Sequence, residues 1–133
     1  MSEAPYNSVV IEHFARPRNA GRLPLDADVI AGSAGDPAQG VRFDLTARVL
    51  ADRIVAVRFE AYGCPHCIAA GSLLSERLEG ATQEQLRRWS WREAAEELEV
   101  PAEKRGRLLI LEDAVRALAA AWQRRSEGRS AGR

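Results

Sequence analysis

The sequence predicts an α+β fold, with helices packed on one face of a small antiparallel sheet of about three strands. Two patterns support this prediction. Residues 41–50 and 54–61 alternate apolar and polar side chains, and this period of two is typical of a half-buried strand. From Ile68 onward, apolar residues recur instead at steps of three and four, which is the spacing of a helix.

The first half of the chain is expected to hold one helix, a long loop and the sheet. Residues 6–15 place apolar side chains at helical spacing, and Pro17 ends this helix. A loop rich in small residues runs on to Gly40 and includes one short edge strand near Val29. Residues 51–53 then join the two long strands, a gap short enough for an antiparallel hairpin. The apolar face of the second long strand is predicted to contain Val55, Val57, Phe59 and Ala61.

The second half of the chain is expected to be helical throughout. Thr82 and Ser90 each begin a capping-box pattern, so two short helices should start there. Pro101 breaks the chain before a last helix. The side chains of that helix predicted to pack on the sheet are Leu108, Leu111, Val115 and Leu118.

The composition fits one domain and excludes several classes of function. We assign residues 1–125 to a single domain and residues 126–133, rich in Gly, Ser and Arg, to a flexible tail. Nineteen basic residues balance nineteen acidic ones, so no overall field attracts nucleic acid or a membrane surface. The longest apolar run, residues 117–122, is too short to span a membrane. Residues 1–5 lack the features of a signal peptide, and we expect a cytoplasmic protein.

Both cysteines of the chain lie in the motif Cys64-Pro65-His66-Cys67, between a predicted strand and a predicted helix. Free amide groups and the positive end of the helix dipole should therefore point at Cys64 and stabilise its thiolate. His66 is expected to lower the pKa of Cys64 or to shuttle a proton. Two ordinary buried thiols are the alternative interpretation, because free cysteine is often buried.

The same motif offers candidate ligands for zinc or iron. Cys64, His66 and Cys67 supply three, and Asp36 supplies a fourth from the loop before the first long strand. Three residues within four positions rarely all reach one metal, so stable metal binding is the less favoured interpretation. Thioredoxin-like thiol oxidants carry a similar motif, but their fold needs strands after the helix, and none is predicted here.

Five segments, in order, resemble the IscU/NifU N-terminal scaffold family, and the resemblance runs from about Tyr6 to Arg125. It implies an α+β fold and a protein that assembles iron–sulfur clusters and delivers them to apo-proteins. Family members hold the cluster on three cysteines, helped by an aspartate and sometimes a histidine. The five segments are residues 6–21, residues 35–40, residues 59–64 with 68–72, residues 94–101 and residues 111–115.

The resemblance also implies that most cluster ligands are replaced. Only Cys64 is kept of the three cysteines, while Gln39 and Val41 stand where the first cysteine and the aspartate belong. Gly106 and Arg107 stand where the histidine and the last cysteine belong. Arginine does not ligate iron at neutral pH, and its charge opposes a nearby cation. The family's iron–sulfur cluster or iron is thus implied by resemblance and opposed by the ligands, while zinc stays open.

Three hypotheses about function follow. The first is an iron–sulfur cluster assembly protein of the scaffold type, diverged at its ligands, which is not an enzyme. It has an accessory or sulfur-handling role, or holds a cluster with ligands from a second chain. Its implied partners are a cysteine desulfurase and other assembly proteins. The second is a thiol–disulfide or persulfide-handling protein on the same fold, in which Cys64 attacks and Cys67 resolves. The third is an inactive paralogue that only binds assembly partners.

Overall fold

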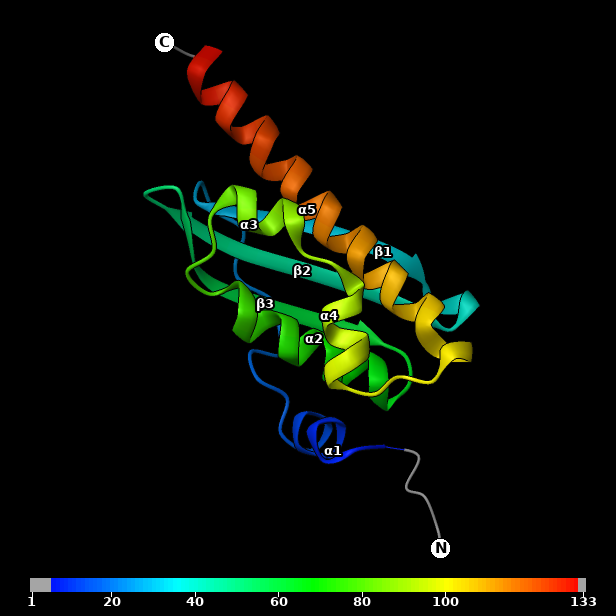
Figure 1. The fold of residues 1–133 in the computed structure, drawn as a ribbon. Helices are drawn as coiled ribbons and strands as arrows, with labels where there is room; N and C mark the ends of the chain where they lie inside the picture. The colour runs from blue at the N-terminus through cyan, green and yellow to red at the C-terminus, as the bar shows by residue number, and fades with distance from the viewer. Residues whose placement is uncertain (1–5, 132–133) are drawn as a thin grey trace, which may run out of the picture.

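The computed structural model describes residues 6–131 of the 133-residue chain. Its sheet has three antiparallel strands in the order β1-β2-β3, and its helices pack against that sheet (Figure 1), as the sequence predicted. The strands are β1 (Val29–Asp36), β2 (Val41–Leu50) and β3 (Arg53–Tyr62). The α-helices are α1 (Ser8–Ala15), α2 (Pro65–Leu78), α3 (Gln83–Arg88), α4 (Trp91–Glu97) and α5 (Arg105–Ala131). Two short 3-10 helices, Pro37–Gln39 and Ala102–Lys104, precede β2 and α5.

The centre of the sheet is β2, which pairs with β1 on one side and with β3 on the other. Ala51 and Asp52 make the turn between β2 and β3, both with positive φ, as a tight hairpin turn requires. The outer edge of β3 is partly covered by the loop after α1. There Phe59 N–H donates to the carbonyl of Asn19 at 3.0 Å, and Gly21 N–H donates to the carbonyl of Phe59 at 2.8 Å.

A β-bulge in the hairpin corrects the prediction for Val55. Arg48 pairs with Ala56, but the next residue, Val49, pairs with Ile54, so that Val55 is left over. Val55 is consequently 47% exposed, whereas Ile54 is fully buried. A bulge places one extra residue in a strand, so Ile54, and not Val55, lies on the buried face together with Val57 and Phe59. The apolar alternation of the sequence contains no signal for this shift, and the face assigned to Val55 was wrong.

The last helix packs on β1 and β2 through the predicted stripe, and these four side chains are all buried: Leu108, Leu111, Val115 and Leu118. Gly32 on β1 makes this close contact feasible. A Cβ at Gly32 would lie 2.3 Å from the backbone nitrogen of Leu118, so the helix backbone rests directly on the strand. Gly32 is therefore a packing requirement, and the small residues of β1 leave that strand without a strong apolar alternation.

The short helices begin where the sequence predicted. Thr82 and Gln85 form a complete capping box at the start of α3, and Ser90 and Glu93 form another at the start of α4. Each box satisfies amide groups that a helix start otherwise leaves unpaired.

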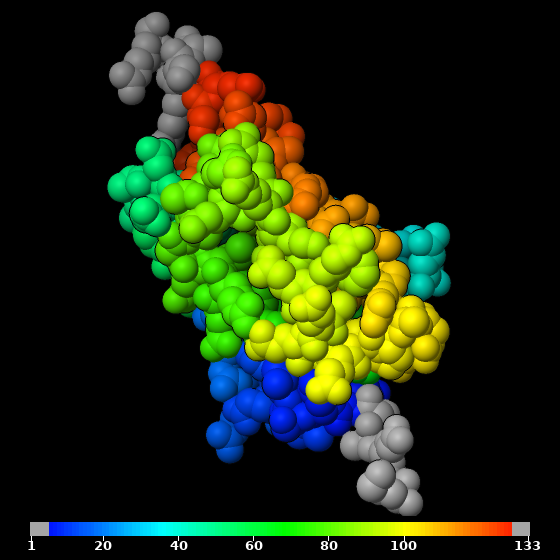
Figure 2. Space-filling model, viewed as in Figure 1, coloured from blue at the N-terminus to red at the C-terminus, as the bar shows by residue number. Residues whose placement is uncertain are grey.

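The helix that follows the cysteine motif, α2, is held from two sides. Gly71 lets it lie close to β3, because a Cβ there would be 2.5 Å from the ring of Phe59. On its other side α2 packs against α1, where the hydroxyl of Ser72 lies 2.7 Å from Nδ1 of His13. Asn7, which caps α1, donates from Nδ2 to the carbonyl of Glu97 at the end of α4. Figure 2 shows the resulting continuous surface of α1 and the segment after α4.

The long helix α5 continues to Ala131 and passes the Ser126 boundary of the expected tail. The mobility of residues 126–133 stays a prediction, and residues 132–133 lie outside the described range. Among the described helices, α5 included, none combines the length and the apolar character that a membrane crossing requires.

Candidate functional site: a pair of thiols at a helix start

The two cysteines lie where β3 gives way to α2, as the motif predicted. Cys64 is the residue that caps α2, with extended backbone angles, and Pro65 occupies the first helical position. Proline fits there because its missing N–H would have had no partner in the helix. The N–H groups of Cys67 and Ile68 donate to the carbonyl of Cys64 at 2.9 and 3.2 Å. The first turn of α2 is thus built around Cys64.

The sulfur atoms of Cys64 and Cys67 are 3.7 Å apart. Cys64 is partly exposed, whereas Cys67 is fully buried in the core with an exposed fraction of 0%. Gly63, with φ of +156°, stands directly before this pair. A Cβ at Gly63 would lie 2.7 Å from the sulfur of Cys67, so only glycine leaves room for that sulfur. The site therefore has one thiol open to solvent and a second thiol directly behind it.

The environment lowers the pKa of Cys64 to about 4. The largest cause is the hydrogen bond that the Cys67 thiol donates to the Cys64 thiolate; partial burial opposes it. The N–H of Cys67, the Arg107 guanidinium and the N–H of His66 add to the lowering. The hydrogen bond to Cys64 and burial raise the pKa of Cys67. The pair thus holds one thiolate, on Cys64, and one thiol, on Cys67.

Arg107 is the third member of the site, and our sequence reasoning missed its role. It lies in the first turn of α5, and the thiolate of Cys64 raises the pKa of its guanidinium through a hydrogen bond and charge attraction. The sequence indicated for this arginine only a charge that opposes a metal cation. Its assignment to a family ligand position was the available signal, since ligand positions converge on one point in space.

The sequence predicted that His66 lowers the pKa of Cys64 or shuttles a proton, but its side chain is buried. Its side chain is 2% exposed, and among the described residues neither ring nitrogen has a hydrogen-bond partner. The ring packs against the ring of Tyr6, with the centroids 4.8 Å apart. The backbone N–H of His66 contributes to the lowered pKa of Cys64.

The loop before β2 approaches the same end of the molecule but serves a local purpose. Asp36 accepts a hydrogen bond from the N–H of Ala38 at 2.9 Å and so caps the 3-10 helix Pro37–Gln39. The carbonyl of Gly40 is 3.6 Å from the Cβ position built at Gly63. Figure 1 shows this loop and the first turn of α5 at one end of the fold.

The structure therefore brings Cys64, Cys67 and Arg107 together. His66 instead packs against Tyr6, and Asp36 caps the 3-10 helix Pro37–Gln39. Within residues 6–131, no three His, Cys, Asp or Glu side chains are gathered so that they could hold a metal ion. Of the positions assigned to replaced family ligands, Val41 is buried on β2 and Gln39 is exposed in the loop. Gly106 directly precedes Arg107 in the first turn of α5.

A three-stranded antiparallel sheet covered by helices, with a thiol site at the start of the helix after β3, defines an α+β scaffold-type domain. The sequence profile of the NifU-like N terminal domain matches residues 5–128. This chain belongs to that family, and the resemblance seen in the sequence is confirmed.

Named relatives agree with this assignment. The chain is 37% identical over 114 residues to the iron-sulfur cluster assembly scaffold protein IscU of Azotobacter vinelandii, covering 84% of this chain and 89% of IscU. It is 39% identical over 126 residues to the bifunctional protein NifU/MnmA of Rubrobacter xylanophilus, but spans only 25% of that longer protein. The crystal structure of the N-terminal NifU-like protein of Brucella abortus has the same fold, with a TM-score of 0.61 at 17% identity over 91% of this chain and 94% of that one.

Proposed function

We propose that this protein is an iron–sulfur cluster assembly protein of the IscU/NifU scaffold type, with an altered ligand set and a sulfur-handling role. The observation that supports it most is the family match along residues 5–128 together with a reactive thiolate at Cys64. Cys64 is the position that the resemblance assigns to a family cysteine. The protein keeps the family's fold and one of its thiols, and it has replaced the others.

The altered ligand set argues for a supporting role in assembly. An iron–sulfur cluster is held by several cysteine thiolates that converge on it. Here Cys64 is the partly exposed thiolate, Cys67 is buried behind it, and the cation of Arg107 stands beside it. A cluster on this site would need ligands from a second chain. Handling sulfur needs only the thiolate of Cys64.

The proposed partners are a cysteine desulfurase and the other proteins of iron–sulfur assembly, in the cytoplasm. The IscU relative named above is described as a scaffold protein, and the proposed role is likewise that of a carrier and not of an enzyme with its own turnover. Neither nucleic acid nor a membrane is expected as a partner, because the overall charge is balanced.

An anaerobic transfer assay tests this function. The chain is mixed with a cysteine desulfurase from the same organism, L-cysteine, ferrous iron and an apo-ferredoxin, and cluster formation on the ferredoxin is followed by absorbance. We expect the chain to bind the desulfurase and to accelerate cluster formation, and the Cys64→Ser variant to lose the acceleration. No binding to the desulfurase and an unchanged rate would overturn the proposal.

A further inference from the structure

We propose that Cys64 and Cys67 together reduce sulfur–sulfur bonds, with Cys64 as the attacking thiolate and Cys67 as the resolving thiol. The proposal deepens the proposed function, since it names the chemistry of the same site. It rests on that function only for its biological setting, because the reaction itself requires neither iron nor a partner protein. It also uses Cys67, which the family resemblance leaves without a role.

The exposure of the two thiols assigns their roles. Cys64 is partly exposed at the first turn of α2, where amide groups stabilise negative charge, and Arg107 adds a cation beside it. Cys67 has an exposed fraction of 0%, so an external sulfur compound cannot reach it directly. It can act only on a sulfur that is already attached to Cys64.

The distance between the thiols suits the second step. Their sulfur atoms are 3.7 Å apart, and a disulfide requires about 2.05 Å, so the sulfurs must approach by rotation of their side chains. Both residues belong to the same first turn of α2, as cap and third helical residue. Gly63 presents no side chain to the sulfur of Cys67 and leaves space for that movement.

The reaction balances with the substrate as its own oxidant. In the first step the Cys64 thiolate attacks the bond of R–S–S–R′, which forms Cys64–S–S–R and releases R′–S⁻. In the second step Cys67 gives up its proton and attacks the sulfur of Cys64, which forms the Cys64–Cys67 disulfide and releases R–SH. Two electrons pass from the two thiols to the substrate, and the sulfur–sulfur bond is cleaved.

Two types of substrate, disulfides and persulfides, can undergo this reaction. In a protein or small-molecule disulfide, R and R′ are both carbon groups, and the products are two thiols. In a persulfide, R is hydrogen, Cys64 carries a sulfur atom after the first step, and the second step releases hydrogen sulfide. The reaction with a persulfide would convert the sulfur that Cys64 carries into the sulfide that clusters contain. A test with each type of substrate separates them.

The experiment is a single turnover of the fully reduced chain without iron. One arm uses oxidised glutathione, and the other uses glutathione persulfide. Free thiols are then alkylated, the cysteine peptides are mapped by mass spectrometry, and released glutathione or sulfide is measured. Wild-type protein is expected to give the Cys64–Cys67 disulfide in at least one arm, and the arm that reacts identifies the source.

The variants divide the two steps. Cys67→Ala is expected to stop after the first step, so that the adduct stays on Cys64 and the intramolecular disulfide is lost completely. Cys64→Ser is expected to form no adduct at all. Arg105→Gln serves as the matched control, because Arg105 lies in the same helical turn but donates to the carbonyl of Val100, and this variant should retain both steps. Circular dichroism confirms that each variant is folded, and the wild-type result stands without any variant.

Two results would overturn the proposal. One is that neither substrate produces the intramolecular disulfide in wild-type protein. The other is that Cys67→Ala releases as much glutathione per chain from oxidised glutathione, or as much sulfide per chain from glutathione persulfide, as wild type. Since iron, desulfurase and ferredoxin are absent, such a failure leaves the transfer assay unaffected. A failed transfer assay with a positive single turnover would instead remove the scaffold function and keep the thiol chemistry.

Discussion

At the scale of single residues, the chemistry of this protein depends on which thiol holds the proton. Cys64 and Cys67 are neighbours in one turn, yet their pKa values are shifted in opposite directions. The partly exposed sulfur receives hydrogen bonds and the charge of Arg107, while the buried sulfur donates its hydrogen to it. The motif therefore contains one nucleophilic thiolate, on Cys64, and one protonated thiol, on Cys67.

The first prediction concerns the reactivity of Cys64. Because its pKa is about 4, Cys64 should stay ionised as the pH falls, and its iodoacetamide labelling should drop by less than about twofold between about pH 7 and pH 5. An ordinary thiol loses roughly tenfold per pH unit over that range. Cys67 should label far more slowly throughout. Peptide mapping of the labelled protein measures both rates.

Arg107→Gln supplies the comparison for that prediction. Loss of the guanidinium should raise the pKa of Cys64, so labelling should decline at a higher pH than in wild type. Arg105 lies in the same helical turn as Arg107, but its side chain donates to the carbonyl of Val100. The Arg105→Gln variant should therefore leave the labelling profile unchanged. Equal and slow labelling of both cysteines would mean that they are ordinary buried thiols.

At the scale of secondary structure, the elements that the sequence predicted well are those whose signals are local. The two long strands, both capping boxes and the buried stripe of α5 follow from spacing alone. The strand near Val29 was expected to be short, but β1 extends over Val29–Asp36. Its Gly, Ala and Ser residues make it look like a loop, and the closeness of the α5 backbone explains Gly32.

The features of the site also differ in how far the sequence could predict them. The motif placed Cys64 and Cys67 at a helix start, and this depends on neighbouring residues. The contact of Arg107 with Cys64 and the burial of His66 against Tyr6 depend on segments that are distant in sequence. No period or motif within one segment contains that information. The role of Arg107 therefore became visible only in three dimensions.

The second prediction concerns the contact between β1 and α5. Gly32→Ala should destabilise the fold by about 3 kcal/mol, because the new methyl group would meet the backbone of α5 at Leu118 and Ala114, which cannot turn aside. Urea unfolding followed by circular dichroism measures this loss. Gly106→Ala is the matched control, since nothing among the described residues lies within 4 Å of its Cβ position. It should be neutral or slightly stabilising in its helix, and equal effects of the two would exclude the close contact.

The third prediction concerns the contact between α1 and α2. Ser72 is buried, and its hydroxyl lies 2.7 Å from both Nδ1 of His13 and the backbone nitrogen of Arg18. Ser72→Ala should cost about 1–3 kcal/mol, because it leaves a buried ring nitrogen and an amide without that partner. Hydrogen exchange should show faster opening of α1. Ser8→Ala, at an exposed position of α1, should change neither quantity by comparison.

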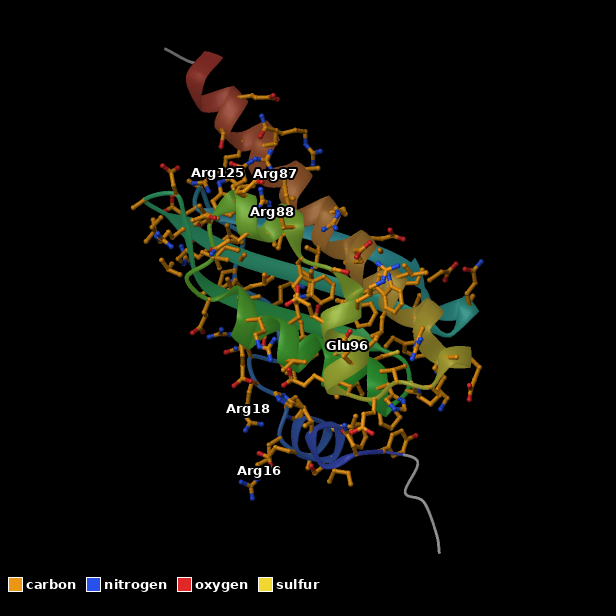
Figure 3. All side chains as sticks on the ribbon, in the orientation of Figure 1. Arg16, Arg18, Arg87, Arg88, Glu96 and Arg125 are labelled. Carbon is orange, nitrogen blue, oxygen red and sulfur yellow. The ribbon has the colours of Figure 1, made fainter. Side chains whose placement is uncertain are left out.

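At the scale of the whole molecule, charge is distributed and largely paired. The labelled arginines of Figure 3 lie at separate places on the surface: Arg16 and Arg18 beside α1, Arg87 and Arg88 on α3, and Arg125 on α5. Arg18 pairs with Glu12, Arg88 with Glu84, and Arg125 with Asp28. The cation of Arg107 differs from these because it is associated with a thiolate. That pairing distinguishes the end of the molecule that holds the site.

The last prediction concerns cluster binding by the isolated chain. Anaerobic reconstitution with ferrous iron and sulfide should give no stable 2Fe–2S cluster, because the site exposes a single thiolate with a cation beside it. The double substitution Gln39→Cys and Arg107→Cys replaces that cation and restores thiols at two positions that the family resemblance assigns to ligands. It should bind measurably more iron and sulfide and develop the visible absorbance of a cluster. Iron analysis and absorbance after gel filtration measure both proteins. A full cluster on each wild-type chain, lost on Cys64→Ser, would instead show that Cys64 and Cys67 hold iron despite Arg107.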